Sequence, residues 1–113
     1  MEFRKKILVI IPAYNEEGSV GKVVEEVRNH FPQGDILVVN DGSTDLTSVK
    51  ARAKGALVLD LPFNLGIGGT MQGGYKYAYE KDYDIAIQVD GDGQHDSREI
   101  PKLFHALEEK RSI

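Results

Sequence analysis

The sequence predicts an α/β protein in which helices cover a parallel β-sheet. Short aliphatic runs occur at residues 7–11, 36–39, 56–59 and 85–89. Between these runs, apolar residues recur every three or four positions, which is typical of helices with one buried face. Strands that are aliphatic throughout are usually buried on both faces. Their alternation with helices indicates right-handed crossovers between parallel strands.

The first helix is expected after the run at residues 7–11, which Pro12 closes. Asn15 is expected to cap this helix, with Glu16 and Glu17 in its first turn. The buried stripe of this helix would consist of Val20, Val23, Val24, Val27 and Phe31.

Three more helices are expected further along the chain. Residues 42–45 (GSTD) predict a turn and a helix cap ahead of a short helix, and a glycine-rich helix start follows Pro62. The expected buried faces are Leu46, Val49 and Ala53 in the short helix, Ile67, Met71, Tyr75 and Ala78 in the glycine-rich helix, and Ile100, Leu103, Phe104 and Leu107 in the last helix.

Composition excludes several classes of function. The 113 residues suit one domain, 1–113, and a formal net charge of -4 without a basic stripe argues against nucleic-acid binding. The chain has no Cys, which excludes disulfides, zinc–thiolate sites and thiol nucleophiles. No apolar run is long enough to span a bilayer, and nothing indicates secretion, so we expect a cytoplasmic location.

Candidate metal ligands follow the fourth aliphatic run. In open α/β sheets, ligands bind beyond the carboxyl ends of the strands, and Asp90 and Asp92 come directly after such an end. Two carboxylates two residues apart on a glycine-rich turn can both reach one hard divalent cation, and Gln94 adds a neutral oxygen at the same spacing. Such a cation usually also binds the oxygens of a substrate phosphate.

Other interpretations compete for the same residues. An acidic turn that only caps the following helix is one alternative. An EF-hand loop fails, because it requires Gly and Glu where this chain has His95 and Pro101. An aspartyl-phosphate phosphohydrolase with Asp90 as nucleophile is the serious rival. Against it, Gly93 stands where Thr or Val is usual, and the motif follows three strands instead of opening the fold.

Asp41, which follows the second run, has two equally weighted interpretations. Its carboxylate would either accept a hydrogen bond from a nucleobase N–H or cap the next helix. Tyr14 would stack on a base or be an ordinary half-buried aromatic, while Pro12 and Ala13 would let a flat ligand approach the backbone. The glycines within residues 66–69 match neither the dinucleotide fingerprint nor the P-loop. Close packing of their helix on the sheet is therefore favoured over phosphate binding.

Together these segments resemble the family 2 inverting glycosyltransferases with the GT-A fold. The matching segments are residues 10–17 (IIPAYNEE), 38–45 (VVNDGSTD), 64–69 (NLGIGG) and 88–96 (QVDGDGQHD). Motifs in this order are very specific together, and they extend over nearly the whole chain. The last segment is most similar to the branch that transfers sugars to dolichyl or polyprenyl phosphate, in which Gln-His follows Asp-x-Asp.

The resemblance implies a Rossmann-like parallel sheet forming the N-terminal half of a GT-A fold. The donor would be a UDP- or GDP-linked sugar and the cation Mg²⁺ or Mn²⁺. The acceptor, for example a polyprenyl phosphate or a cell-envelope glycan, would attack the anomeric carbon with inversion. A lipid acceptor would place the protein at the cytoplasmic face of a membrane. The implied metal ligands are Asp90, Asp92 and Gln94, and the implied nucleotide-sugar site is Pro12, Ala13, Tyr14, Glu16, Asp41, Gly68, Asp90, Gly91 and Asp92.

Two residues depart from the family pattern. Asn40 stands where many members carry a first Asp before Asp-Gly-Ser, and Phe63 stands where a basic residue often contacts the diphosphate. Family members also continue well past Asp-x-Asp, so we assign no catalytic base here. We expect this chain to be a truncated, donor-binding portion that binds a nucleoside diphosphate weakly and transfers no sugar. The open edge of the fourth strand would favour homo-oligomers. A nucleotide-binding module without turnover is the third hypothesis.

Overall fold

The computed structural model describes residues 5–90 and contains a parallel sheet with strand order β3-β2-β1-β4. The elements are β1 (Ile7–Ala13), α1 (Val20–His30), β2 (Asp35–Asn40), α2 (Thr47–Ala53), β3 (Leu57–Asp60), α3 (Gly66–Glu80) and β4 (Ile85–Gln88). The predicted α/β class and the parallel sheet are confirmed. β4 lies at one end of the described sheet, and the self-association expected through its edge stays a prediction.

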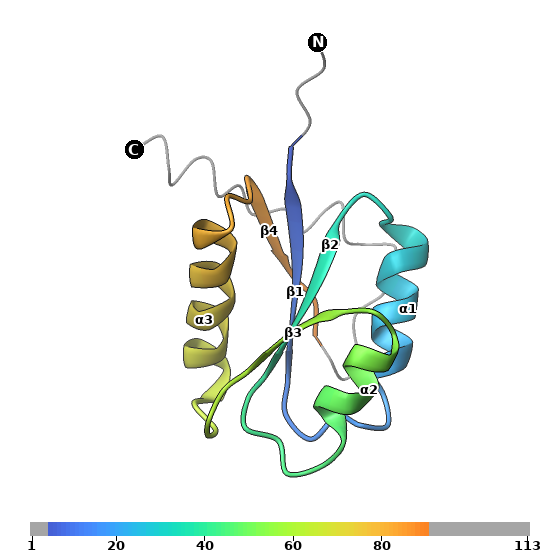
Figure 1. Cartoon of the computed structure of the whole chain (residues 1–113), viewed down its shortest axis with the longest axis vertical. Helices are drawn as coiled ribbons and strands as arrows, with labels where there is room; N and C mark the ends of the chain where they lie inside the picture. The colour runs from blue at the N-terminus through green and yellow to red at the C-terminus, as the bar shows by residue number, and fades with distance from the viewer. Residues whose placement is uncertain (1–4, 91–113) are drawn as a thin grey trace.

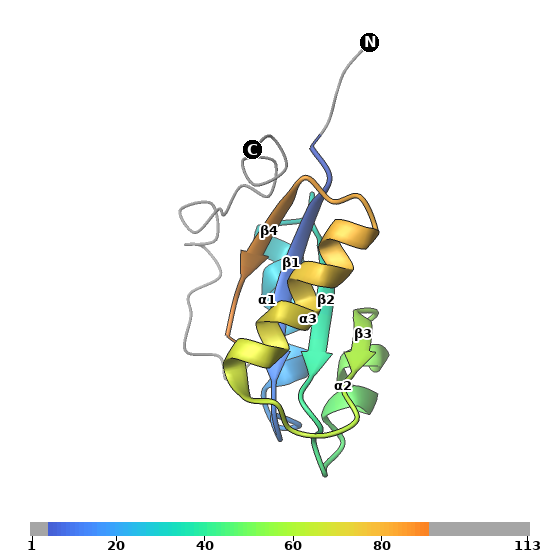
Figure 2. The same ribbon diagram turned by 90° about the vertical axis from the view of Figure 1, so that its left-hand side faces the viewer.

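Helices cover both faces of the sheet, as Figures 1 and 2 show: α1 and α2 lie on one face and α3 lies on the other. Because side chains alternate along a strand, β1 contributes Val9 and Ile11 to the core under α1 and α2. It contributes Leu8 and Ile10 to the core under α3. Among the helices within residues 5–90, none combines the length and the apolar character needed to cross a membrane.

The α1 helix has the predicted buried stripe, because Val20, Val23, Val24, Val27 and Phe31 are all buried. The predicted cap is wrong. Ser19 occupies the N-cap position and no side chain caps the helix. The carbonyl of Glu16 accepts the amides of Ser19 and Val20, which closes a turn before the helix starts and leaves Asn15 outside it. For the same reason, neither predicted Glu lies in the first turn.

The predicted buried face of α2 is wrong. Thr47 and Ala51 are buried, whereas Leu46 and Val49 are exposed. The carboxylate of Asp45 accepts both the amide (2.9 Å) and the hydroxyl of Thr47, so the helix starts at that residue and turns its small side chains toward the sheet. Partial desolvation acts to raise the pKa of Asp45, but these hydrogen bonds outweigh it and hold the pKa below its ordinary value.

The predicted buried face of α3 is correct except at Ile67. Met71 and Ala78 are buried and Tyr75 packs, partly buried, against the same core, whereas Ile67 is exposed and Gly74 takes part in the buried face. A Cβ at Gly74 would lie 2.7 Å from the Ile10 side chain, so this glycine lets the helix pack closely on β1. The close packing of this helix on the sheet is therefore supported at Gly74, whereas a Cβ at Gly66 or Gly68 would meet no atom within 4 Å. The helix predicted after the fourth strand, with its stripe at residues 100–107, lies outside the described residues.

Pro12 does not end β1, which continues to Ala13, but it coincides with the end of pairing on one side. The ladder between β1 and β4 ends at Ile10 and Gln88, followed by one hydrogen bond from the Val89 amide to the Ile10 carbonyl. Pro12 has no N–H to donate, so the ladder cannot continue in the same pattern. Pairing of β1 with β2 continues to Ala13 and Asn40.

Candidate functional site

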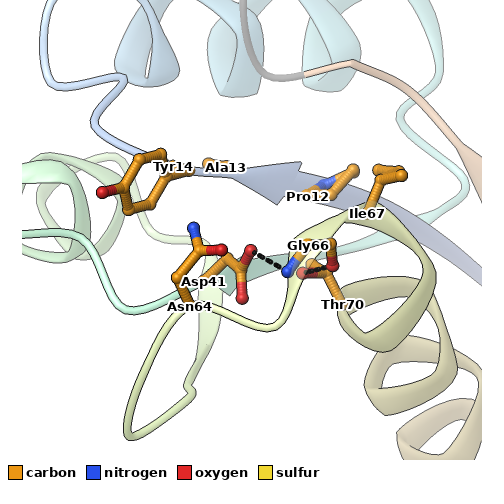
Figure 3. A pocket seen from close by; sticks show the side chains of 8 residues that line it. All are labelled: Pro12, Ala13, Tyr14, Asp41, Asn64, Gly66, Ile67 and Thr70. Carbon is orange, nitrogen blue, oxygen red and sulfur yellow. Dashed lines mark hydrogen bonds between the residues drawn. The ribbon is translucent and has the colours of Figure 1, made fainter.

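A cavity of about 270 Å³ opens at the carboxyl ends of β1 and β2 (Figure 3). The end of β1 forms one wall, and the start of α3 with the loop before it forms the opposite wall. Its lining is mostly apolar or small, with few polar side chains. The lining residues are Pro12, Ala13, Tyr14, Asp41, Asn64, Gly66, Ile67 and Thr70.

Asp41 lies at the floor of this cavity and is only 4% exposed. One carboxylate oxygen, Oδ1, accepts the amide of Leu65 at 2.7 Å, and Oδ2 accepts the amide of Gly66 at 2.9 Å. The carboxylate therefore caps α3, not the next helix in the chain, α2. An ionised carboxylate offers about four acceptor positions, so two backbone contacts leave capacity for a ligand N–H.

The carboxylate of Asp41 occupies the N-terminus of α3, where a bound anion would otherwise be favoured. A helix N-terminus favours an anion, and here a side chain of the same protein supplies it. Gly68, in the first turn of α3, is exposed and does not line the cavity. Its predicted role in nucleotide-sugar binding stays a prediction.

The predicted site residues at the end of β1 and in the loop after it fall into two groups. Pro12, Ala13 and Tyr14 line the cavity, and the Tyr14 ring faces Asn64 across it (Figure 3). Glu16 does not line it; its carboxylate accepts the Ser19 hydroxyl at 2.9 Å. Glu16 is therefore a structural residue of the loop in this arrangement, and a role toward a ligand stays a prediction.

Asn40, the departure from the family pattern, has a structural explanation. Its Nδ2 donates to Asp60 at the end of β3 at 3.0 Å, and its Oδ1 accepts the amide of Ser43 at 3.2 Å. The hydrogen bond from Asn40 holds the pKa of Asp60 below its ordinary value against partial burial, and Arg52 contributes in the same direction. An amide at position 40 satisfies both a carboxylate and an N–H, which a second carboxylate cannot do.

The substitution Asn40→Asp is expected to lower the free energy of unfolding by about 1 kcal/mol, because a carboxylate at the buried position 40 would then face the carboxylate of the more exposed Asp60. Chemical denaturation at neutral pH measures this loss. The double variant N40D/D60N restores one carboxylate and one amide and should recover most of it. A double variant no more stable than N40D would contradict this account of the pair.

Asp90 is the predicted metal ligand that the structure describes, and it follows β4 at the same edge of the sheet as the cavity. It lies two residues beyond Gln88, the last residue of β4 that pairs with β1, and this pairing ends at Ile10, two residues before Pro12 of the cavity wall. A carboxylate at this edge of the sheet suits a hard cation. Gly91, Asp92 and Gln94 lie outside the described residues, and within residues 5–90 no group of three acidic, His or Cys side chains is placed to hold a metal.

Sequence reasoning missed part of the cavity. Asn64, Gly66, Ile67 and Thr70 line it, although none was predicted as a site residue. Asn64 could have been found, because it is a polar residue after the third strand and belongs to the same edge as Asp41. No pattern distinguishes Ile67 from a core residue, since its spacing in the helix matches that of buried positions.

Comparison with known proteins identifies the family. The family model described as Glycosyl transferase family 2 matches residues 8–113. The chain belongs to glycosyl transferase family 2. An undecaprenyl-phosphate mannosyltransferase from Micrococcus luteus is 34% identical over 107 residues, a match that covers 90% of this chain and 44% of that protein. The chain thus spans less than half the length of this curated relative.

Solved structures of similar proteins agree with the fold. The glucosyl-3-phosphoglycerate synthase from Mycobacterium tuberculosis, in complex with Mn²⁺, UDP and glucosyl-3-phosphoglycerate, matches with a TM-score of 0.64 and 26% identity, over 77% of this chain and 33% of that one. The mannosyltransferase PcManGT from Pyrobaculum calidifontis, in complex with GDP-Man and Mn²⁺, matches with a TM-score of 0.72 over 86% of this chain and 30% of that one. Its 20% identity supports the fold alone. The predicted GT-A architecture is confirmed.

Proposed function

We propose that this chain supplies nucleotide-sugar and metal binding in a glycosyltransferase that transfers a sugar from a UDP- or GDP-linked donor, with inversion. The observation that carries the proposal is the cavity at the carboxyl edge of the sheet. It combines apolar walls with a nearly buried carboxylate, Asp41, and so matches a flat base that carries an N–H. Membership of glycosyl transferase family 2 supports the same reaction.

The nucleobase would lie between Tyr14 and the start of α3. Pro12 and Ile67 offer apolar surface to the faces of a ring, and the Tyr14 ring offers a stacking surface. Asp41 would accept the N–H of the base. The amide group of Asn64 both donates and accepts, so it matches the carbonyl or amino groups that flank that N–H.

The donor diphosphate would lie toward Asp90. We place a divalent cation, Mg²⁺ or Mn²⁺, on Asp90, Asp92 and Gln94, where it would neutralise the charge of the diphosphate leaving group. The M. tuberculosis relative, solved with Mn²⁺ and UDP, supports this use of a cation. Gly91 between the two acids would let the backbone turn so that both carboxylates face one ion.

The acceptor that we propose is a polyprenyl phosphate. The support is the relative from M. luteus, which is named for undecaprenyl phosphate and is 34% identical to this chain. An acceptor of this kind resides in a membrane, so the protein would work at the cytoplasmic face of one. The base that takes the acceptor proton is not assigned among the described residues.

Calorimetric titration of the chain with UDP and with GDP, with and without Mn²⁺, tests the proposed function. We expect binding that requires the metal, and a rise in melting temperature that grows with ligand concentration. Asp92→Ala should abolish the metal-dependent part, because the diphosphate charge would be left uncompensated, and Asp90→Ala should weaken it strongly. Metal-dependent nucleotide binding also separates this function from aspartyl-phosphate hydrolysis.

Glu80→Gln is a matched control, because Glu80 is an exposed acid at the far end of α3, where its partner is Lys76 at 3.9 Å. It should leave both the affinity and the metal dependence unchanged. Unchanged Mn²⁺-linked binding in Asp92→Ala would show that the metal assignment is wrong. Absence of binding to either nucleotide would overturn the proposed function itself.

A further inference from the structure

The wall of the cavity that carries Tyr14 leaves the sheet just before that residue. Ala13 is the last residue of β1 and pairs with Asn40, and its carbonyl accepts the Asp41 amide at 2.9 Å. Beyond this point the sheet no longer holds the chain. Tyr14 is 46% exposed, so packing alone does not fix its side chain.

The residue after Tyr14 adopts an unusual backbone conformation. Asn15 has a φ of 52°, in the left-handed region that side chains with a Cβ rarely occupy. Asn tolerates this region better than most residues, because its short polar side chain can bond locally. A conformation of this kind persists only when its surroundings hold it.

Side chains of the loop after β2, and of Thr47 at the start of α2, hold this conformation. The amides of Asn15 and Glu16 donate to Ser43 Oγ at 2.9 Å and to Thr47 Oγ1 at 2.8 Å. The amide of Glu17 donates to the carboxylate of Asp45, in the loop after β2, at 3.2 Å. In return, Asn15 Oδ1 accepts the Thr44 amide at 2.9 Å. We call this set of contacts between the loops after β1 and β2 the interloop clamp.

The interloop clamp links two sides of the cavity. The loop after β2 begins with Asp41, and the loop after β1 begins with Tyr14. Asp41 is held independently, by the α3 amides that its carboxylate accepts. Loss of the clamp would therefore release Tyr14 while leaving Asp41 in place, and the distance between the two would no longer be set.

We infer that Asn15 is a positioning residue for nucleotide binding: through Ser43 and Thr44 it holds Tyr14 at the distance from Asp41 that a bound base requires. The inference rests on the proposed function, because it assigns a role toward the ligand of that same cavity. Asn15 itself does not line the cavity, so it acts on the ligand through Tyr14.

A double-mutant cycle between Asn15 and Tyr14 tests this role, with calorimetric affinities of the full chain for UDP and GDP in Mn²⁺. Asn15→Ala should weaken binding about tenfold, the size expected for loss of one coupling between contacting groups. In the Tyr14→Ala background the same change should have almost no effect, because there is no ring left to position. Asn15→Asp keeps an acceptor and tolerates the backbone conformation, so it should retain most of the affinity.

Asp82→Ala is the matched control, because Asp82 also has a positive φ, 62°, in the turn after α3. It should lower the melting temperature as Asn15→Ala does, without changing nucleotide affinity. Equal loss of affinity in both variants would show a general effect of stability and overturn the inference. Additive effects of Asn15→Ala and Tyr14→Ala would overturn it too, while the proposed function would stand. A wild-type chain that binds neither nucleotide would overturn both.

Discussion

Asp41→Ala is expected to lower the free energy of unfolding by about 3 kcal/mol and to remove most of the nucleotide affinity. The stability term comes from the amides of Leu65 and Gly66, which donate to the two carboxylate oxygens at 2.7 and 2.9 Å. Hydrogen bonds to a charged group contribute about 1.5–3 kcal/mol, and amides left without an acceptor add to the loss. The affinity term comes from the position of the carboxylate at the floor of the cavity.

Chemical denaturation and calorimetry measure the two effects of Asp41→Ala separately. Asp41→Asn keeps one acceptor oxygen and should lie between the wild type and Ala in both. Asp35→Ala removes a carboxylate that accepts the Tyr83 hydroxyl at 2.6 Å, at the other end of β2, and should lower stability alone. If Asp41→Ala loses stability but keeps its nucleotide affinity, the carboxylate is only a helix cap. If stability is unchanged, the contacts with α3 contribute nothing.

Gly42→Ala is expected to lower the free energy of unfolding by about 3 kcal/mol or more. Gly42 has a φ of +70°, and a Cβ there would lie 2.6 Å from both the Asn64 nitrogen and the Phe63 carbonyl carbon. Both neighbours are backbone atoms, so no rotamer change relieves the clash. The segment before α3 would have to move, and Asn64 would move away from Asp41.

Thermal unfolding and nucleotide titration of Gly42→Ala measure the loss of stability and of affinity. Gly18→Ala is the control at the same edge of the sheet, because a Cβ there would meet no atom within 4 Å and the backbone conformation is not left-handed. It should change stability by only a few tenths of a kcal/mol. A Gly42→Ala variant as stable as Gly18→Ala would mean that Gly42 packs less closely on the segment before α3 than described.

Local patterns were enough for the strands and for the edge that carries the chemistry. A run such as residues 36–39 is aliphatic throughout, and a strand covered on both faces buries such a run completely. Because parallel strands end at one edge, the positions of Asp41, Asp90 and Tyr14 after their strands predicted that they share this edge, and Asp41 and Tyr14 do line one cavity there. Helix faces were less predictable: Leu46, which precedes α2, and Val49 within it have the spacing of a buried face but are exposed.

The sequence by itself determined the parallel α/β class, the family, and the strand ends that carry Pro12, Tyr14 and Asp41, because periodicity and motif order are local properties of the chain. Only the tertiary structure decided what Asp41 and Asn15 contact. Asp41 reaches α3, a helix 25 residues further along, and Asn15 reaches the loop after β2 instead of the helix beside it. Both contacts arise because the order β3-β2-β1-β4 brings the loops after neighbouring strands together, and spacing along the chain carries no record of that order.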